Sequence, residues 1–210
     1  MFVGHYSASF ALKAARPKVP LWVLFLAAQA VDIGWGTLIL LGIEKARIVP
    51  GITATYPLDL YYMPYTHSLL AGAGWALTLG ALYFAWRRRD GALAALAVGA
   101  AVLSHWFLDL PMHTYDLPLY DNTDKQGWGL WDHPLGAFVL ECGLLAAAVA
   151  LYAHTRPAAR KAAWIFCGVL VLIQAGQNFG PWLLPTPDAV AISALVSYFL
   201  FAFVASRIEA

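Results

Sequence analysis

Residues 91–110 read GALAALAVGAAVLSHWFLDL, an apolar segment that ends in SHWFLD at 104–109. About 20 apolar residues are enough for a helix to cross a bilayer. A helix turns once in about 3.6 residues, so His105 and Asp109, which are four apart, point to the same side and could hold one proton or one metal ion together. Ionisable side chains at membrane depth are costly and usually face an interior cavity, so this pair is a functional-site hypothesis.

The composition of the whole chain is that of an integral membrane protein. Of its 210 residues, 61% are hydrophobic and 12% are charged, with a mean hydropathy of +0.65. In soluble domains about 45–50% of the residues are apolar and about 25% are charged. The charges are clustered between apolar segments, and no basic face for nucleic acid emerges, so we expect no nucleic-acid partner. Cys142 and Cys167 both lie in apolar segments, which argues against a disulfide framework.

Apolar segments of spanning length recur along the chain. They predict an all-α integral membrane bundle of about six transmembrane helices, forming a single domain over residues 1–210. The predicted spans are 20–43, 65–86, 91–110, 134–153, 162–179 and 189–206. Residues 1–12 are apolar but too short to cross, which predicts a short re-entrant or interfacial helix. They lack the basic segment of a cleaved signal, so we expect them to be retained.

Two long segments between the spans are polar. Residues 44–64 predict a loop whose Tyr56, Tyr61 and Tyr62 fit an aromatic belt at the water interface. Residues 111–132 carry four aspartates and a single lysine, and they exceed the roughly 12–15 residues at which structureless loops become uncommon. We expect this second segment to be a lid or to form part of a site.

Basic residues predict the orientation, because Lys and Arg favour the cytoplasmic side of a membrane. With six spans, all basic clusters fall on one side: Lys13, Arg16 and Lys18, then Arg87–Arg89, then Arg156, Arg160 and Lys161, then Arg207. Both termini are therefore expected in the cytoplasm, and the loop 111–132 outside. The expected location is a bacterial or archaeal cytoplasmic membrane.

Polar side chains fall at similar depths in three predicted spans. At about 1.5 Å per residue, His67 lies about 30 Å from the cytoplasmic end of the second span, His105 and Asp109 about 22–28 Å up the third, and Asp32 about 18–20 Å up the first. His5 would lie only about 12 Å deep if residues 1–12 re-enter from the cytoplasmic side. These depths predict a shared pocket in the outer half of the bilayer.

Imidazole and carboxylate ligands suit zinc, non-haem iron or manganese. A catalytic zinc holds three protein ligands and a water whose pKa falls to about 7. The predicted ligands of a divalent metal, most simply zinc, are His67, His105, Asp109, Asp32 and His5. Each of them could instead hydrogen-bond a neighbouring helix.

Four further polar residues are candidates for supporting roles. Glu141, two turns into the fourth span, must be neutral, paired or in water, and it is a candidate proton relay. His133, His113 and Gln177 are candidates for contacts with a substrate or with the ligands. His133 could equally take part in capping the fourth span next to Asp132.

The order of four motifs resembles a known family. GHY at 4–6, VDI at 31–33, THSLL at 66–70 and SHxxxD at 104–109 resemble the membrane-bound metal-dependent hydrolases, also described as LexA-binding inner-membrane-associated hydrolases. That family has an early His, a Pro-Asp-x-Asp motif, a Thr-His-Ser motif and a Ser-His-x-x-x-Asp motif. The resemblance covers about residues 4–110 and implies metal-site roles for His5, Asp32, His67, His105 and Asp109.

The chain departs from the family pattern at two places. Gly34 stands where the second acid of Asp-x-Asp is expected, which argues for one metal rather than two, or for a scaffold that has lost catalysis. Tyr62-Met63-Pro64 replaces a His-Arg-Gly that usually precedes the Thr-His-Ser motif. An arginine that could clamp a phosphate in a bidentate way is therefore missing there.

These observations predict a metal-dependent hydrolase that acts on an ester or phosphoester of a lipid or another amphiphile near the outer face, with Asp32 or Glu141 as proton acceptor. Two alternatives use the same polar cluster. One is a non-enzymatic small-molecule or proton-coupled transporter. The other is a bis-His haem protein, because His67, His105 and His133 come from different spans.

Overall fold

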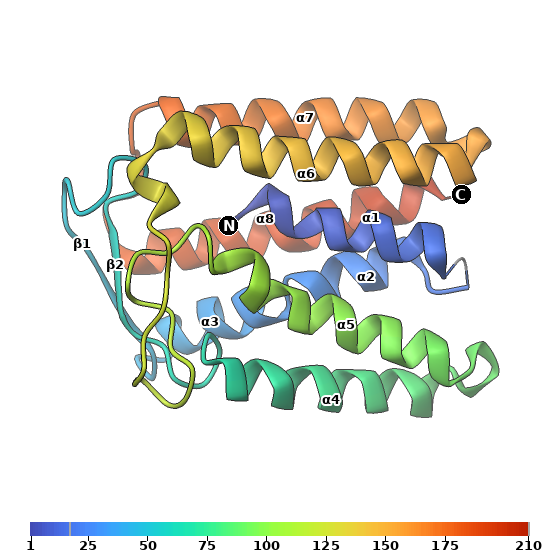
Figure 1. Ribbon diagram of the computed structural model, residues 1–210, viewed down its shortest axis with the longest axis horizontal. Coiled ribbons are helices and arrows are strands. Elements are labelled where there is room, and N and C mark those ends of the chain that lie inside the picture. The colour runs from blue at the N-terminus through green and yellow to red at the C-terminus, as the bar shows by residue number, and fades with distance from the viewer. Residues whose placement is uncertain (17, 210) are drawn as a thin grey trace.

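The computed structural model describes residues 1–16 and 18–209, and the apolar segments of the sequence form its helices (Figure 1). Among these residues the long elements are α1 (Tyr6–Ala15), α2 (Leu21–Ala28), α3 (Ala30–Leu40), α4 (Leu69–Trp86), α5 (Ala92–Asp109), α6 (Pro134–Thr155), α7 (Arg160–Phe179) and α8 (Pro187–Ile208). Short 3₁₀ turns are η1 (Val3–His5), η2 (Arg88–Asp90), η3 (Leu130–Asp132) and η4 (Pro157–Ala159). The predicted all-α bundle is confirmed.

Five of these helices, α4 to α8, are each long and apolar enough to cross a membrane. The predicted first span is a broken one, because α2 and α3 are bent by 52° relative to each other at Gln29. Counting that pair as one span gives six, as the sequence predicts. The second span begins at Leu69 rather than near residue 65, because Ser68 is extended and its hydroxyl accepts a hydrogen bond from the Ala71 amide as an N-cap.

The first residues of the chain lie inside the bundle. Tyr6 and Phe10 are fully buried, and α1 packs against α2 and α6. Figure 1 shows the N-terminus midway along the bundle, from where α1 leads to the end at which α8 finishes. Lys13, near the end of α1, forms an ion pair with Glu209 after α8. This placement fits a re-entrant segment rather than a helix lying on the surface.

Residues 44–64 were predicted to be a loop, and this prediction is wrong for part of the segment. β1 (Lys45–Ile48) pairs antiparallel with β2 (Leu58–Tyr62), with Arg47 opposite Asp59. The alternation in Leu58-Asp59-Leu60-Tyr61 is the period of a half-buried strand, and Leu60 is buried while Tyr61 is exposed. The hairpin lies across one end of the bundle (Figure 1).

The two ends of the bundle differ in charge. The α1–α2, α4–α5 and α6–α7 turns and the C-terminus, which carry the basic clusters, lie at one end (Figure 1). The hairpin and the segment 111–132 lie at the other end. This is the arrangement that six spans require. Which end faces the cytoplasm stays a prediction from the positive-inside rule.

Residues 111–132 form an ordered cover over the ends of α4 and α5. Two isolated bridges, Leu117 with Gln126 and Tyr120 with Thr123, fold the segment on itself. The Pro118 carbonyl accepts a hydrogen bond from the Leu69 amide, and this ties the segment to the start of α4. The expectation of a site-forming segment is met in one respect: the segment carries His113 into the interior, where its side chain is buried.

Gly127 gives a test of this cover. Its φ is +152°, and an added Cβ would lie 1.6 Å from the Thr114 carbonyl oxygen, so Gly127→Ala must displace the backbone beside His113. We expect a destabilisation of roughly 1–3 kcal/mol, measured as a lower thermal midpoint in detergent. Gly143→Ala is the control, since Gly143 is helical and an added Cβ there has nothing within 4 Å. Equal midpoints for the two variants would contradict the backbone constraint.

Candidate metal centre

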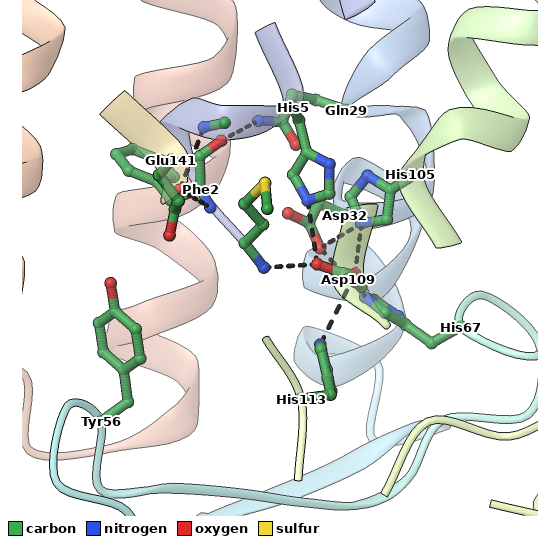
Figure 2. Close-up of polar contacts among 12 residues, drawn as sticks. Phe2, His5, Gln29, Asp32, Tyr56, His67, His105, Asp109, His113 and Glu141 are labelled. Atoms are coloured by element: carbon green, nitrogen blue, oxygen red, sulfur yellow. Dashed lines mark hydrogen bonds and ion pairs between the residues drawn. The ribbon is translucent and has the colours of Figure 1, made fainter. Parts of the chain in front are cut away.

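Six ionisable side chains converge in the interior of the bundle, although they come from separate parts of the chain (Figure 2). They come from η1, α3, α5 and the segments just before α4 and just after α5: His5, Asp32, His67, His105, Asp109 and His113. Two overlapping groups have ligand atoms within 4.8 Å of one another: His5 with His105 and Asp109, and Asp32 with His67 and His105. The structure therefore brings together all five metal ligands that the sequence predicts.

The Asp109 carboxylate lies at the centre of this cluster. Its Oδ1 is 3.2 Å from His5 Nε2, and it contacts the amino group of Met1. Its Oδ2 is 3.2 Å from His105 Nε2, 3.6 Å from His113 Nε2 and 3.9 Å from His67 Nε2. The two oxygens of one carboxylate thus face two different sets of nitrogens.

Asp32 supplies the second carboxylate from the first turn of α3. Its Oδ1 lies 3.3 Å from His67 Nε2 and 3.5 Å from His105 Nε2. Its Oδ2 accepts a hydrogen bond of 2.7 Å from the hydroxyl of Tyr198 on α8. Tyr198 therefore holds Asp32 with one oxygen turned toward the two imidazoles.

The break between α2 and α3 orients His105. The last four carbonyls of a helix have no partner within that helix. Ala28, the final residue of α2, uses its carbonyl oxygen to accept a hydrogen bond from His105 Nδ1 at 2.8 Å. Because a carbonyl can only accept, the proton lies on Nδ1, and in the neutral ring Nε2 presents a lone pair to the cluster.

His67 is oriented by a chain of two hydrogen bonds that begins at a buried carboxylate. Glu44 accepts hydrogen bonds from the amides of Tyr65 and Thr66 at 2.8 and 3.0 Å, and from the Thr66 hydroxyl at 2.6 Å. The single hydroxyl proton of Thr66 is used in that bond. Thr66 Oγ1, 2.9 Å from His67 Nδ1, must therefore accept, which leaves the Nε2 lone pair of neutral His67 for the cluster.

His113, which lies outside the spanning helices, is also oriented by a hydrogen bond at its Nδ1 atom. Its Nδ1 lies 2.9 Å from the Asp116 carboxylate, so Nδ1 carries a proton. Burial alone lowers the pKa of His113, but the carboxylates of Asp116 and Asp109 outweigh that effect and raise the pKa to about 9. The sequence predicts only a supporting contact for His113, whereas the structure places it in the cluster.

The spacing of the central atoms suits a metal ion better than hydrogen bonds. Four separations join Nε2 of His67 and His105 to one oxygen each of Asp32 and Asp109, and they are 3.2, 3.3, 3.5 and 3.9 Å. Hydrogen bonds between charged N–H and O⁻ are shorter, about 2.7–2.9 Å. Ligand atoms about 2.0–2.1 Å from a tetrahedral zinc lie about 3.3–3.4 Å apart.

Buried ring nitrogens without hydrogen-bond partners support the same interpretation. Among the described residues, His5 Nδ1 has no polar partner, and the Nε2 atoms of His5 and His105 have no hydrogen bond of good geometry, although each lies 3.2 Å from an oxygen of Asp109. The ring of His5 stacks on that of His105, with centroids 3.7 Å apart. An orphaned buried acceptor is costly unless something binds it. This buried His/Asp group could hold a metal ion.

The remaining predicted site residues lie elsewhere. Glu141 is buried, but its carboxylate accepts hydrogen bonds from the amides of Phe2 and Gly4 and from the Gln174 side chain. It lies beside the N-terminal segment, away from the imidazoles (Figure 2). His133 is exposed just before α6.

Gln177 and Gly34 line two different cavities. Gln177 lines a cavity of about 380 Å³ that also reaches Asp32, His67, Asp109 and His113. Gly34 lines a cavity that none of the six cluster residues line, and an added Cβ there would lie 3.2 Å from the Thr66 methyl group and 3.6 Å from the Trp75 ring. An acid at position 34 would therefore meet Thr66 and Trp75 in this fold.

Sequence reasoning missed three supporting residues. Asp116 contacts His113 Nδ1 directly, Glu44 supports His67 Nδ1 through the Thr66 hydroxyl, and Tyr198 holds Asp32. The spacing of Asp116, three residues after His113, is a local signal that was available. Glu44 lies 23 positions before His67 and Tyr198 lies 166 positions after Asp32, so no local pattern connects them.

No family model, curated protein or solved structure matches the chain. The class of protein is therefore defined by the fold and the site alone. The chain is a helical membrane protein whose interior holds a His/Asp cluster that could bind a metal ion.

Thr66→Val tests the support of His67. The change removes the hydroxyl that accepts from His67 Nδ1, and loss of such supporting hydrogen bonds typically lowers metal affinity about 10–100-fold. We expect that loss in zinc competition titrations against a chelator.

Thr37→Val is the matched control, because the Thr37 hydroxyl bonds only to the Ile33 carbonyl within α3. Thr66→Ser should restore wild-type affinity. If Thr66→Val bound zinc as tightly as Thr37→Val, the proposed orientation of His67 would be wrong.

Proposed function

We propose that the protein is an integral membrane hydrolase that depends on one divalent metal ion, zinc. The observation that carries the proposal is the convergence of acceptor atoms from Asp32, His67, His105 and Asp109, with nitrogen–oxygen separations of 3.2 to 3.9 Å. His67, His105 and Asp109 would hold the ion and leave the fourth position to a water molecule beside Asp32. Two carboxylates balance the charge of one divalent cation, and nitrogen and oxygen ligands in a tetrahedral arrangement are typical of zinc. The motif order shared with membrane-bound metal-dependent hydrolases supports the same assignment.

The cavity reaches the cluster from one side. Asp32, His67 and Asp109 line the 380 Å³ cavity, whereas His5 and His105 are absent from its lining and lie behind them. A substrate in the cavity therefore meets the carboxylate side of the cluster. A zinc ion held there would lower the pKa of a water molecule and polarise an ester or phosphoester oxygen.

The chain's own residues move the protons. Of the two acceptors predicted from sequence, Asp32 reaches the cavity, while the Glu141 carboxylate is committed to the Phe2 and Gly4 amides. Asp32 is therefore the proposed proton acceptor through Oδ1, because Tyr198 occupies only Oδ2, and His67, His105 and Asp109 are the proposed ligands. His113 also lines the cavity, with Nδ1 held by Asp116, so its Nε2 is placed to give a proton to the departing group.

The proposed substrate is an ester or phosphoester of an amphiphile, reached from the hairpin end of the bundle. By the positive-inside rule that end is the outer face of a bacterial or archaeal cytoplasmic membrane. The haem alternative finds less support, because two carboxylates lie within 4 Å of His67 Nε2 and hard oxygen ligands suit a divalent ion better than haem iron. Transport by the same cluster stays a prediction.

Metal analysis tests the centre directly. Purified protein should carry about one zinc per chain, and His105→Ala should lose most of it because one of three ligands, the one oriented by the Ala28 carbonyl, is removed. His154→Ala is the control, since His154 is exposed near the end of α6. Negligible metal in both wild type and His105→Ala, by elemental mass spectrometry, would end the proposal.

Hydrolysis is the second test. Nitrophenyl acyl esters and nitrophenyl phosphoesters in mixed micelles should be cleaved, with activity lost on chelation and restored by zinc. Asp32→Asn should lower the rate at least about 100-fold, because the proton acceptor is lost. Asp188→Asn, at the exposed start of α8, should not change it. Solute flux in proteoliposomes that requires Asp32, without hydrolysis, would instead favour the transporter.

A further inference from the structure

The cavity of about 380 Å³ extends well beyond the metal cluster. Its lining runs from Asp32 and Asp109 past the hairpin residues Leu58 and Leu60 to the turn between α7 and α8, residues 180–186. This volume lies within the range of small-molecule sites, about 300–1,000 Å³. The cavity therefore has room for more of a substrate than the bond that is cleaved.

The charged groups of this cavity are confined to one end. Asp32 and Asp109, with the amino group of Met1 beside Asp109, lie at the cluster end, and no lysine or arginine side chain is among the described lining residues. The far end is lined by Trp182, Leu183, Leu184 and Val190. A ligand that matches both ends has a polar group at one end and a hydrocarbon at the other.

Helix α8 leaves space along one side of the cavity. The residues that it contributes there are small, namely Ser193, Ala194 and Ser197, between Val190 and Tyr198. Val196, on the same helix, is 63% exposed and is not part of the lining. A row of small side chains beside an apolar wall is suited to a slender chain.

The mouth of the cavity is apolar and exposed. The turn reads Pro181-Trp182-Leu183-Leu184-Pro185, and Leu183 is 79% exposed although it lies outside the helices. Tryptophan and apolar residues at a helix end are typical of the membrane interface. The turn therefore joins the cavity to the region where membrane lipids lie.

We propose that this cavity binds one hydrocarbon chain of a membrane amphiphile. The bond to be cleaved lies at Asp32, His67 and Asp109, and the hydrocarbon chain of the amphiphile follows α8 toward the turn 181–185. The inference rests on the proposed function for the position of the reacting bond. The binding of the hydrocarbon chain itself depends only on the cavity.

A photoreactive probe tests this placement. A dodecanoic acid methyl ester with a diazirine near the end of its chain is added to the protein in nanodiscs, irradiated, and mapped by peptide mass spectrometry. Labelling within residues 181–198 should be saturable and should fall at least tenfold in the presence of excess methyl dodecanoate. Labelling elsewhere on the lipid-facing helices should be neither saturable nor displaced.

Variants on α8 separate the cavity from the membrane surface. Ala194→Phe fills the cavity and should reduce the saturable labelling at least tenfold, and Ser197→Leu should act in the same direction. Val196→Phe adds the same ring as Ala194→Phe on the exposed side of α8 and should leave the labelling unchanged. Labelling that does not saturate, or that is equal in Ala194→Phe and Val196→Phe, would overturn the inference.

Zinc content distinguishes the two proposals. Ala194→Phe and Ser197→Leu should retain wild-type zinc, which also shows that they fold. Saturable labelling of a wild-type protein that binds no zinc would contradict the proposed function but support the binding site for the hydrocarbon chain. Zinc-bound protein without saturable labelling would contradict the binding site for the hydrocarbon chain but support the metal centre.

Discussion

The buried carboxylate of Asp109 is the constraint around which the interior is arranged. A charge taken out of water costs several kcal/mol unless partners compensate it. Here the partners come from four segments: the start of the chain, His67 before α4, His105 on α5 itself, and His113 after α5. Satisfying one carboxylate therefore fixes the N-terminal segment and the two connections that flank α4 and α5.

The broken span is the second element on which the site depends. A continuous helix over residues 21–40 would use the Ala28 carbonyl within its own ladder. The break at Gln29 releases that carbonyl to His105 and starts a new helix whose first turn carries Asp32, where a carboxylate is favourable. The Gln29 side chain donates to the Phe2 carbonyl and so joins the break to the start of the chain.

Two further buried acids support the site without facing it. Glu44 joins the end of the first span to the Thr66-His67 segment, and Glu141 holds the amides of Phe2 and Gly4 in place. Both satisfy backbone amides that would otherwise be buried without partners. Acidic residues inside this bundle thus divide into two that face the imidazoles, Asp32 and Asp109, and supports that hold the segments carrying the histidines.

The sequence by itself determined the spans and the pairing of His105 with Asp109. Spans follow from the length of apolar segments that a bilayer requires, and an i,i+4 pair follows from helix geometry, so both are local properties. Only the tertiary structure decided that His113 joins the cluster, that Glu44 supports His67 through Thr66, and that Gly34 packs against Thr66 and Trp75. These outcomes depend on the 52° bend and on how distant segments pack, which hydropathy does not encode.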